Sequence, residues 1–198
     1  ELKRFIANPV ELQFVTDSGK LRTVCGIVGG VSEGQGDGGL ATYLLMVRDA
    51  FSLLEHTCNT RVFRNRNEID ITETILREWR LANPIAAAAF RFESGGLKQY
   101  PPREFTMQYN ESNAAFLRRL WKRRGIAWFI KAGASNERGS SDVPVHTLVL
   151  FDNPNALEKN PAGAARYHRD HGTEQRDSIT SWHGVRKLTA GRVNRHSW

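Results

Sequence analysis

The sequence is poor in the features that carry covalent, metal or membrane chemistry. Its 198 residues include only two cysteines, Cys25 and Cys58, which excludes a disulfide-stapled scaffold and predicts reduced thiols. No apolar run approaches the roughly 18 residues that a membrane-spanning helix needs. The H-E-x-x-H motif of metalloproteases and the G-x-S-x-G motif of α/β-hydrolases are both missing from the sequence. These absences argue against a disulfide-rich, a transmembrane or a familiar hydrolytic protein.

The composition is that of a folded chain with a moderate positive charge. Apolar residues make up 40% and charged residues 25% of the sequence, which disfavours wholesale disorder. Lys and Arg number 28 against 21 Asp and Glu, so the formal net charge is +7. This excess permits an acidic partner without identifying one. The chain opens at Glu1 without Met and closes at Trp198 without a polar tail, which predicts a piece of a longer protein.

The first quarter of the chain has the pattern of antiparallel strands. Apolar side chains alternate over residues 10–16, and turn residues separate this segment from a second strand over residues 22–31. A third strand is predicted over residues 40–48, and its two apolar or small faces favour a central position. Three strands with short connections indicate part of a barrel or sandwich.

Gly34, Gly36 and Gly39 spell a literal G-x-G-x-x-G motif between the second and third strands. A dinucleotide site of this kind requires a helix after the loop, so that the helix N-terminus meets the pyrophosphate. Because a strand is expected to follow instead, we interpret the glycines as a hairpin loop.

The middle of the chain predicts helices and a compact α+β unit. A short helix is expected over residues 50–56, and a longer one begins after Asn67 and runs to about residue 81. The segment 85–102 gives no clear pattern. The α+β unit is predicted to contain one helix with flanking strands, over residues 105–109 (strand), 113–124 (helix), 126–131 (strand) and 145–151 (strand). Ser112 is the expected N-cap of that helix and Gly125 its stop, with Phe116 and Trp121 on its buried side.

Two features leave functional alternatives open. His168 and His171, with Asp170, Asp177 and His183 nearby, could bind a metal ion in a metallohydrolase, but no third ligand is fixed and ordinary surface histidines are favoured. The helix 113–124 carries five cations, and their arrangement is compatible with a solvated face, an acidic protein partner or nucleic acid. The five are Arg118, Arg119, Lys122, Arg123 and Arg124. Neither a helix-turn-helix nor an aromatic sheet motif accompanies them, which disfavours nucleic acid.

Several segments in consistent order resemble one family. They include the stretch Gln-Tyr-Asn-Glu-Ser-Asn over residues 108–113, the Gly-Ile at 125–126 and the Arg-Val-Phe at 61–63. Their order and spacing resemble VgrG, the spike protein of type VI secretion (also called Rhs-element Vgr protein), and the related tail hub of contractile phages. The residues that carry the resemblance, as structural motif positions, are Gly26, Arg61, Phe63, Gln108, Tyr109, Glu111, Ser112, Phe116, Leu117, Gly125 and Trp182.

The resemblance implies a fold and a role. The fold would be α+β, a partial antiparallel β-barrel followed by a smaller α+β section. Its parts would be residues 1–48 (partial first barrel), 49–102 (helical connection), 103–177 (α+β section) and 178–198 (start of a truncated second barrel).

The implied protein is a structural hub or spike rather than an enzyme, with no catalytic residue, metal or cofactor. Its partners would be two further copies in a homotrimer, the hexameric tail-tube protein, and baseplate and effector proteins, with no membrane span. It would be assembled in the bacterial cytoplasm and then ejected into the target cell or medium. The alternative is a nucleic-acid-binding module that uses helix 113–124.

Overall fold

The computed structural model describes most of the chain as a mixture of helices and antiparallel and parallel strands, which confirms the α+β class. The described residues are 2–34, 36, 39, 41–133, 144–159, 163–169, 176–188, 191 and 194. They form two compact units. The first contains residues 1–14 and 21–158, and the second contains residues 15–20 and 159–198.

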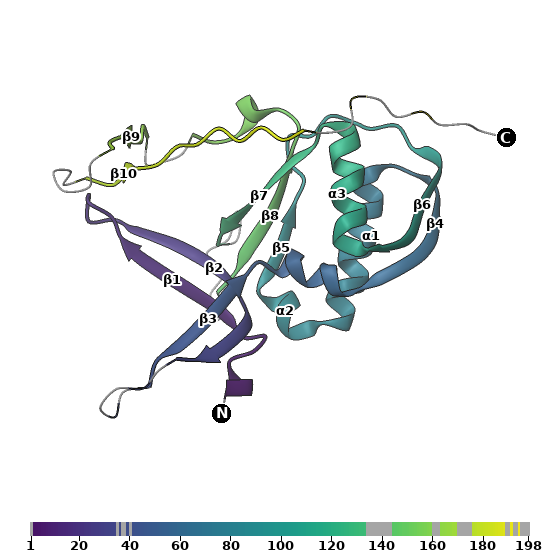
Figure 1. The fold of residues 1–198 in the computed structure, drawn as a ribbon. Coiled ribbons are helices and arrows are strands. Elements are labelled where there is room, and N and C mark those ends of the chain that lie inside the picture. Colours follow the sequence, from purple (N-terminus) through teal and green to yellow (C-terminus); the bar gives the residue numbers. More distant parts are fainter. Residues whose placement is uncertain are drawn as a thin grey trace. The chain divides into compact units, whose positions relative to one another are not determined.

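The N-terminal part of the chain is a three-stranded sheet in the order β1-β2-β3 (Figure 1). A single 3-10 turn, η1 (Leu2–Arg4), precedes the strands β1 (Pro9–Val15), β2 (Leu21–Glu33) and β3 (Tyr43–Arg48). The three predicted strands are therefore confirmed. Gly34 N donates to Thr42 O at 2.8 Å, which continues the β2–β3 pairing toward the glycine loop. A strand, not a helix, follows that loop. The helix N-terminus that a dinucleotide site requires is therefore not supplied there, in agreement with the interpretation as a hairpin loop.

The predicted central position of the third strand is wrong. In the described part of the chain β3 lies at the edge of its sheet, and β2 occupies the centre. The side chains from Tyr43 to Met46 are all exposed, so both faces of β3 are apolar without being covered by the described residues. The described strands form open sheets, and the partial barrel stays a prediction.

Three helical segments of the first unit begin in different ways. The predicted 50–56 helix is the 3-10 segment η2 (Ala50–His56), capped by Asp49, whose side chain accepts from Ser52 N. Helix α1 (Glu68–Ala82) begins with a reciprocal capping box between Asn67 and Asp70, which confirms the predicted start. Helix α2 (Pro84–Ala88) follows with proline in its first turn.

The next feature is a long antiparallel ribbon that leads directly into a helix. Strand β4 (Cys58–Arg66), which the sequence pattern did not predict, pairs with β6 (Arg103–Ser112). Helix α3 (Asn113–Arg124) begins directly after Ser112, the last residue of β6, whose Oγ caps the helix by accepting from Ala115 N at 3.1 Å. Gly125 ends the helix with φ 72°, a left-handed conformation that glycine adopts without strain. The predicted limits of this helix are confirmed.

A second three-stranded sheet has the order β5-β8-β7. Strands β7 (Ala127–Ala132) and β8 (His146–Phe151) are antiparallel and confirm the prediction, whereas β5 (Phe90–Glu93) pairs in parallel with β8 and lies in the segment that gave no pattern. Beyond β8 comes the 3-10 turn η3 (Pro154–Ala156).

The hydrophobic core of the first unit surrounds α1 and α3, which contact each other beside the β4–β6 ribbon (Figure 1). Trp121 is 1% exposed, and its ring stacks on Phe51 with centroids 5.2 Å apart. Its Nε1 donates to Thr72 Oγ1 on α1 at 2.9 Å. Phe116 is fully buried. The predicted buried side of α3 is thereby confirmed.

The second unit contains the short parallel strands β9 (Arg166–Tyr167) and β10 (Ser178–Ile179). The strand expected to begin at residue 178 is therefore only two residues long, and residues 180–188 have no regular structure. Asp170 and His171 of the proposed metal cluster lie outside the described residues. None of the helices in the described ranges has the length and apolar character that crossing a membrane requires.

Candidate functional site

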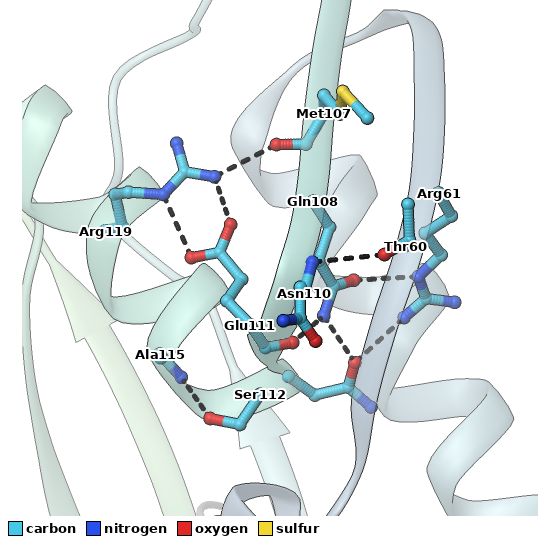
Figure 2. A network of polar contacts seen from close by, with 10 residues as sticks. Thr60, Arg61, Met107, Gln108, Asn110, Glu111, Ser112, Ala115 and Arg119 are labelled. Atoms are coloured by element: carbon cyan, nitrogen blue, oxygen red, sulfur yellow. Dashed lines mark hydrogen bonds and ion pairs between the residues drawn. The ribbon is translucent and has the colours of Figure 1, made fainter.

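The inner face of the β4–β6 ribbon carries polar side chains where a core-facing strand usually carries apolar ones. The strand register places Arg61 of β4 opposite Gln108 of β6. Gln108 is fully buried, and its Oε1 accepts from Arg61 Nε at 2.9 Å (Figure 2). Arg61 also forms an ion pair with Glu78 on α1. One arginine therefore fastens both ribbon strands to the helix behind them.

A single side-chain oxygen at the start of α3 collects donors from both ribbon strands. Asn113 Oδ1 accepts from Gln108 Nε2 at 3.0 Å and from Arg61 Nη2 at 3.2 Å. Asn59 Nδ2 donates to the same oxygen at 3.1 Å. Gln108 Nε2 also donates to Glu111 O at 2.9 Å. We call Asn59, Arg61, Gln108 and Asn113 the junction network, because together they fix the strand-to-helix corner.

A second clamp ties the outer side of α3 to β6. Arg119 Nε donates to Glu111 Oε2 at 3.1 Å, and Arg119 Nη2 donates to Met107 O at 3.0 Å (Figure 2). The hydrogen bonds to Glu111 raise the pKa of Arg119, so the guanidinium group keeps its positive charge. This charge-assisted fork holds the helix against the strand that precedes it.

The other residues behind the family resemblance are spread over the structure. Phe63 stacks on Phe116 with ring centroids 5.9 Å apart, and Leu117 is fully buried. Gly26 lies where a Cβ would come within 2.7 Å of Val47 Cγ1, so this glycine permits close strand pairing. The structure places two of the residues at the surface: Tyr109 is 71% and Trp182 is 77% exposed.

The cations of the basic helix α3 are less free to bind phosphate than their number in the sequence suggests. Arg118 pairs with Glu55, Arg119 with Glu111, and Arg124 with the fully buried Glu68. Three of the five cations therefore bind carboxylates of the same chain. This arrangement weakens the nucleic-acid alternative.

Around His168 and His183, the described residues show no arrangement typical of a metal or catalytic site. Within the described ranges no group of three or more His, Cys, Asp or Glu side chains is arranged to hold a metal ion. His168 N donates to Ile179 O at 3.0 Å, which continues the short β9–β10 pairing. Ser181 Oγ lies 2.6 Å from His183 Nε2, but both residues are exposed on an irregular segment. Among the described residues, the junction network is thus the most extensive polar site. Its contacts hold the strand-to-helix corner in one geometry.

Three residues of these polar contacts were not singled out from the sequence: Asn59 and Asn113 of the junction network, and Glu78, which pairs with Arg61. Asn113 lies in the stretch 108–113 that carries the resemblance, and its amide at the first position of the helix was the available signal. Asn59 and Glu78 gave none, because their contacts join segments that are distant along the chain.

All residues from 1 to 198 match the family described as phage tail baseplate hub (GPD). Among curated proteins, the Type VI secretion system spike protein VgrG1b of Pseudomonas aeruginosa is 27% identical over 98% of this chain and 24% of its own length. VgrG4b of the same organism is 31% identical over 85% of this chain and 19% of its own length. The Actin cross-linking toxin VgrG1 of Vibrio cholerae is 27% identical over 80% of this chain and 13% of its own length.

Among solved structures, an E. coli component of the type VI secretion system, described as structurally similar to the T4 bacteriophage tail proteins gp27 and gp5, has a TM-score of 0.56 at 22% identity. The match covers 74% of this chain and 36% of that one, and it shows the fold. The chain spans about a quarter or less of the length of these curated relatives. The resemblance to VgrG is confirmed.

Proposed function

The chain belongs to the phage tail baseplate hub family, and we propose that it is a structural segment of the hub or spike of a type VI secretion machine. The observation that carries this proposal is the family match over the whole of residues 1–198. The names of the relatives, several of them spike proteins of type VI secretion systems, support it. No reaction is part of the proposal.

The polar sites support a mechanical role for the first unit. A hub must keep its shape under load, and the junction network joins β4, β6 and α3 through directional bonds around a fully buried Gln108. The ion pair between Arg61 and Glu78 adds α1. Buried hydrogen bonds of this kind specify one arrangement, because any displaced donor would lose its partner away from water. We propose that the motif residues Arg61, Gln108, Glu111 and Ser112 serve this purpose.

The sheet β1-β2-β3 supports the partial barrel and the trimer. Phe14 is 53%, Leu44 71% and Met46 60% exposed, and apolar surface of this extent is typical of regions that another surface covers. We propose that this sheet is part of the first barrel, that residues 49–102 connect it to an α+β section over 103–177, and that 178–198 begin the second barrel.

In the full-length protein, three copies would form the base of the spike. Repeated barrels in a trimer would present pseudo-sixfold symmetry to the hexameric tail-tube protein. Baseplate and effector proteins would be further partners. The assembled spike would then leave the bacterial cytoplasm for the target cell or medium.

Light scattering of the full-length protein tests the proposal. We expect the mass of a trimer, and Leu44→Asp should lower the trimer fraction by placing a charge in the apolar sheet surface. Leu81→Asp is the matched control, because Leu81 is 81% exposed on α1, away from that sheet. A full-length protein that is monomeric at all concentrations would contradict the proposal, as would equal effects of the two variants.

A further inference from the structure

Three arginines gather at the open end of the β4–β6 ribbon. Arg66 and Arg103 are direct cross-strand partners. Loss of hydration lowers the pKa of Arg123 on α3, the positive charge of Arg103 lowers it further, and the carboxylate of Glu68 opposes this effect. Among the described residues, no carboxylate lies within salt-bridge distance of these three side chains. Arg103 Nε is buried and has no hydrogen-bond partner there.

An exposed apolar stripe continues from these arginines along the outer face of the ribbon. The register pairs Val62 with Met107 and Arg64 with Phe105. Side chains two positions apart on a strand share a face, so this face also holds Arg66 and Arg103. Val62 is 45%, Met107 37% and Phe105 49% exposed. We call this surface, with Arg123 beside it, the ribbon patch. Its members are Val62, Arg64, Arg66, Arg103, Phe105, Met107 and Arg123.

The charges of the ribbon patch are unfavourable in the isolated chain. Like charges directly opposite each other on a strand pair repel, and no carboxylate in the described part of the chain lies within salt-bridge distance of Arg66 or Arg103. Elsewhere the same fold pairs its arginines, as with Arg118 and Glu55 or Arg119 and Glu111. A partner with negative charge would complete the ribbon patch in the same way.

The chemistry of the ribbon patch selects among the possible partners. Arginine forks match carboxylates in pairs, and Arg, Met and aromatic residues are enriched at the centres of protein interfaces. A phosphate backbone would leave Val62, Phe105 and Met107 without an apolar complement. A second copy of the chain would bring a net charge of +7 of its own. We propose that the ribbon patch docks an acidic segment of a different protein, one in which carboxylates alternate with apolar side chains.

This docking site does not depend on trimer formation. The ribbon patch lies on β4, β6 and α3, whereas the surface proposed for assembly lies on β1, β2 and β3. A trimeric full-length protein without peptide binding, or the reverse, would therefore separate the two proposals.

The test measures fluorescence anisotropy of a labelled synthetic peptide that alternates Glu with Leu and Phe. We expect the chain to bind it, and to discriminate against a peptide with Lys in place of Glu. The double variant Arg66→Ala with Arg123→Ala should weaken binding about tenfold or more, and Met107→Ser by a few-fold, in the range typical of central interface residues. Arg77→Ala is the matched control, because Arg77 is exposed on α1 and lies outside the ribbon patch.

A stability measurement distinguishes a binding role from a structural one. Because repulsion by Arg103 and attraction by Glu68 act on Arg123 in opposite directions, Arg123→Gln should leave the melting temperature nearly unchanged while weakening peptide binding. A lower melting temperature would show that Arg123 holds the fold and would overturn the proposal. So would absent peptide binding, equal loss in the Arg77→Ala control, or tighter binding of a DNA duplex that Met107→Ser leaves unaltered.

Discussion

The convergence of three donors on Asn113 Oδ1 makes this side chain the most informative position to change. The oxygen accepts from Asn59, Arg61 and Gln108, and Asn113 itself is 6% exposed. Asn113→Ala removes the acceptor while the donors stay in place. Gln108 Nε2 keeps its bond to Glu111 O, but Arg61 Nη2 loses this acceptor. Each of the three lost hydrogen bonds contributes about 0.5–1.5 kcal/mol, and two of their donors are only partly buried, so we expect Asn113→Ala to lower the free energy of unfolding by about 1–3 kcal/mol.

Asn113→Asp is the matched control, because it keeps an oxygen at the same position. Its negative charge would strengthen the hydrogen bond from Arg61 and would lie in the first turn of α3, where the helix dipole favours an anion by about 0.3–1 kcal/mol. The partial burial of the new charge opposes these gains, so we expect stability close to that of the unsubstituted chain.

Urea unfolding followed by tryptophan fluorescence measures the stability of both variants, since Trp121 is a residue of α3 and lies in the core. We expect Asn113→Ala to unfold at a clearly lower urea concentration than Asn113→Asp. Unfolding of Asn113→Ala at the same urea concentration as the unsubstituted chain, or equal destabilisation of the two variants, would refute this role of Asn113.

Two further predictions concern the core of the first unit. Trp121→Ala should cost about 3–5 kcal/mol in urea unfolding, as expected for a buried aromatic, whereas the exposed Trp182→Ala should cost little; equal costs would contradict the packing. Burial lowers the pKa of His146, whose Nε2 accepts from Ala50 N at 2.8 Å, so the unfolded chain binds a proton more readily than the folded one. Stability should therefore be full above about pH 6.5 and fall as the pH drops below that value. In His146→Gln the melting temperature should vary less between pH 5 and 7, and an unchanged slope would exclude His146 as the cause.

The parts of the fold that local chemistry determines could be predicted from the sequence. Helix α3 combines an N-cap at Ser112, a left-handed stop at Gly125 and a regular apolar side, and its limits were predicted to the residue. The N-cap residue Asn67 likewise indicated the start of helix α1. These signals lie within a few residues of each other, so no knowledge of distant contacts was needed.

Strand β4 could not be predicted, because polar and apolar residues occur on both of its faces. Its inner side chains are those of Asn59 and Arg61, which belong to the junction network, and of Phe63, which stacks on Phe116, while Val62 faces outward. The alternation of apolar and polar residues that indicates a strand is therefore missing. β5 escaped prediction for a different reason: its four residues are held by parallel pairing with β8, a partner far along the chain.

The candidate site was only partly accessible to sequence reasoning. Gln108, Glu111 and Arg61 were singled out through the family resemblance, but nothing in their spacing showed that Arg61 and Gln108 touch. The pairing depends on the β4–β6 register, which is a tertiary property. The apolar residues on both faces of β3 could be recognised in the sequence, but they wrongly predicted a central strand. A strand with two buried faces and a strand with two exposed apolar faces have the same sequence pattern.

The parallel pairing of β5 with β8 has a consequence for biosynthesis. Phe90 leaves the ribosome long before its partner His146, and β6, α3 and β7 are all translated between them. Until that later stretch emerges, β5 has neither its hydrogen-bonding neighbour nor the strand that completes the sheet. The helical half of the first unit can fold as it is translated, whereas its sheet must wait for β8. Closure of this sheet is therefore a late step in the folding of the first unit.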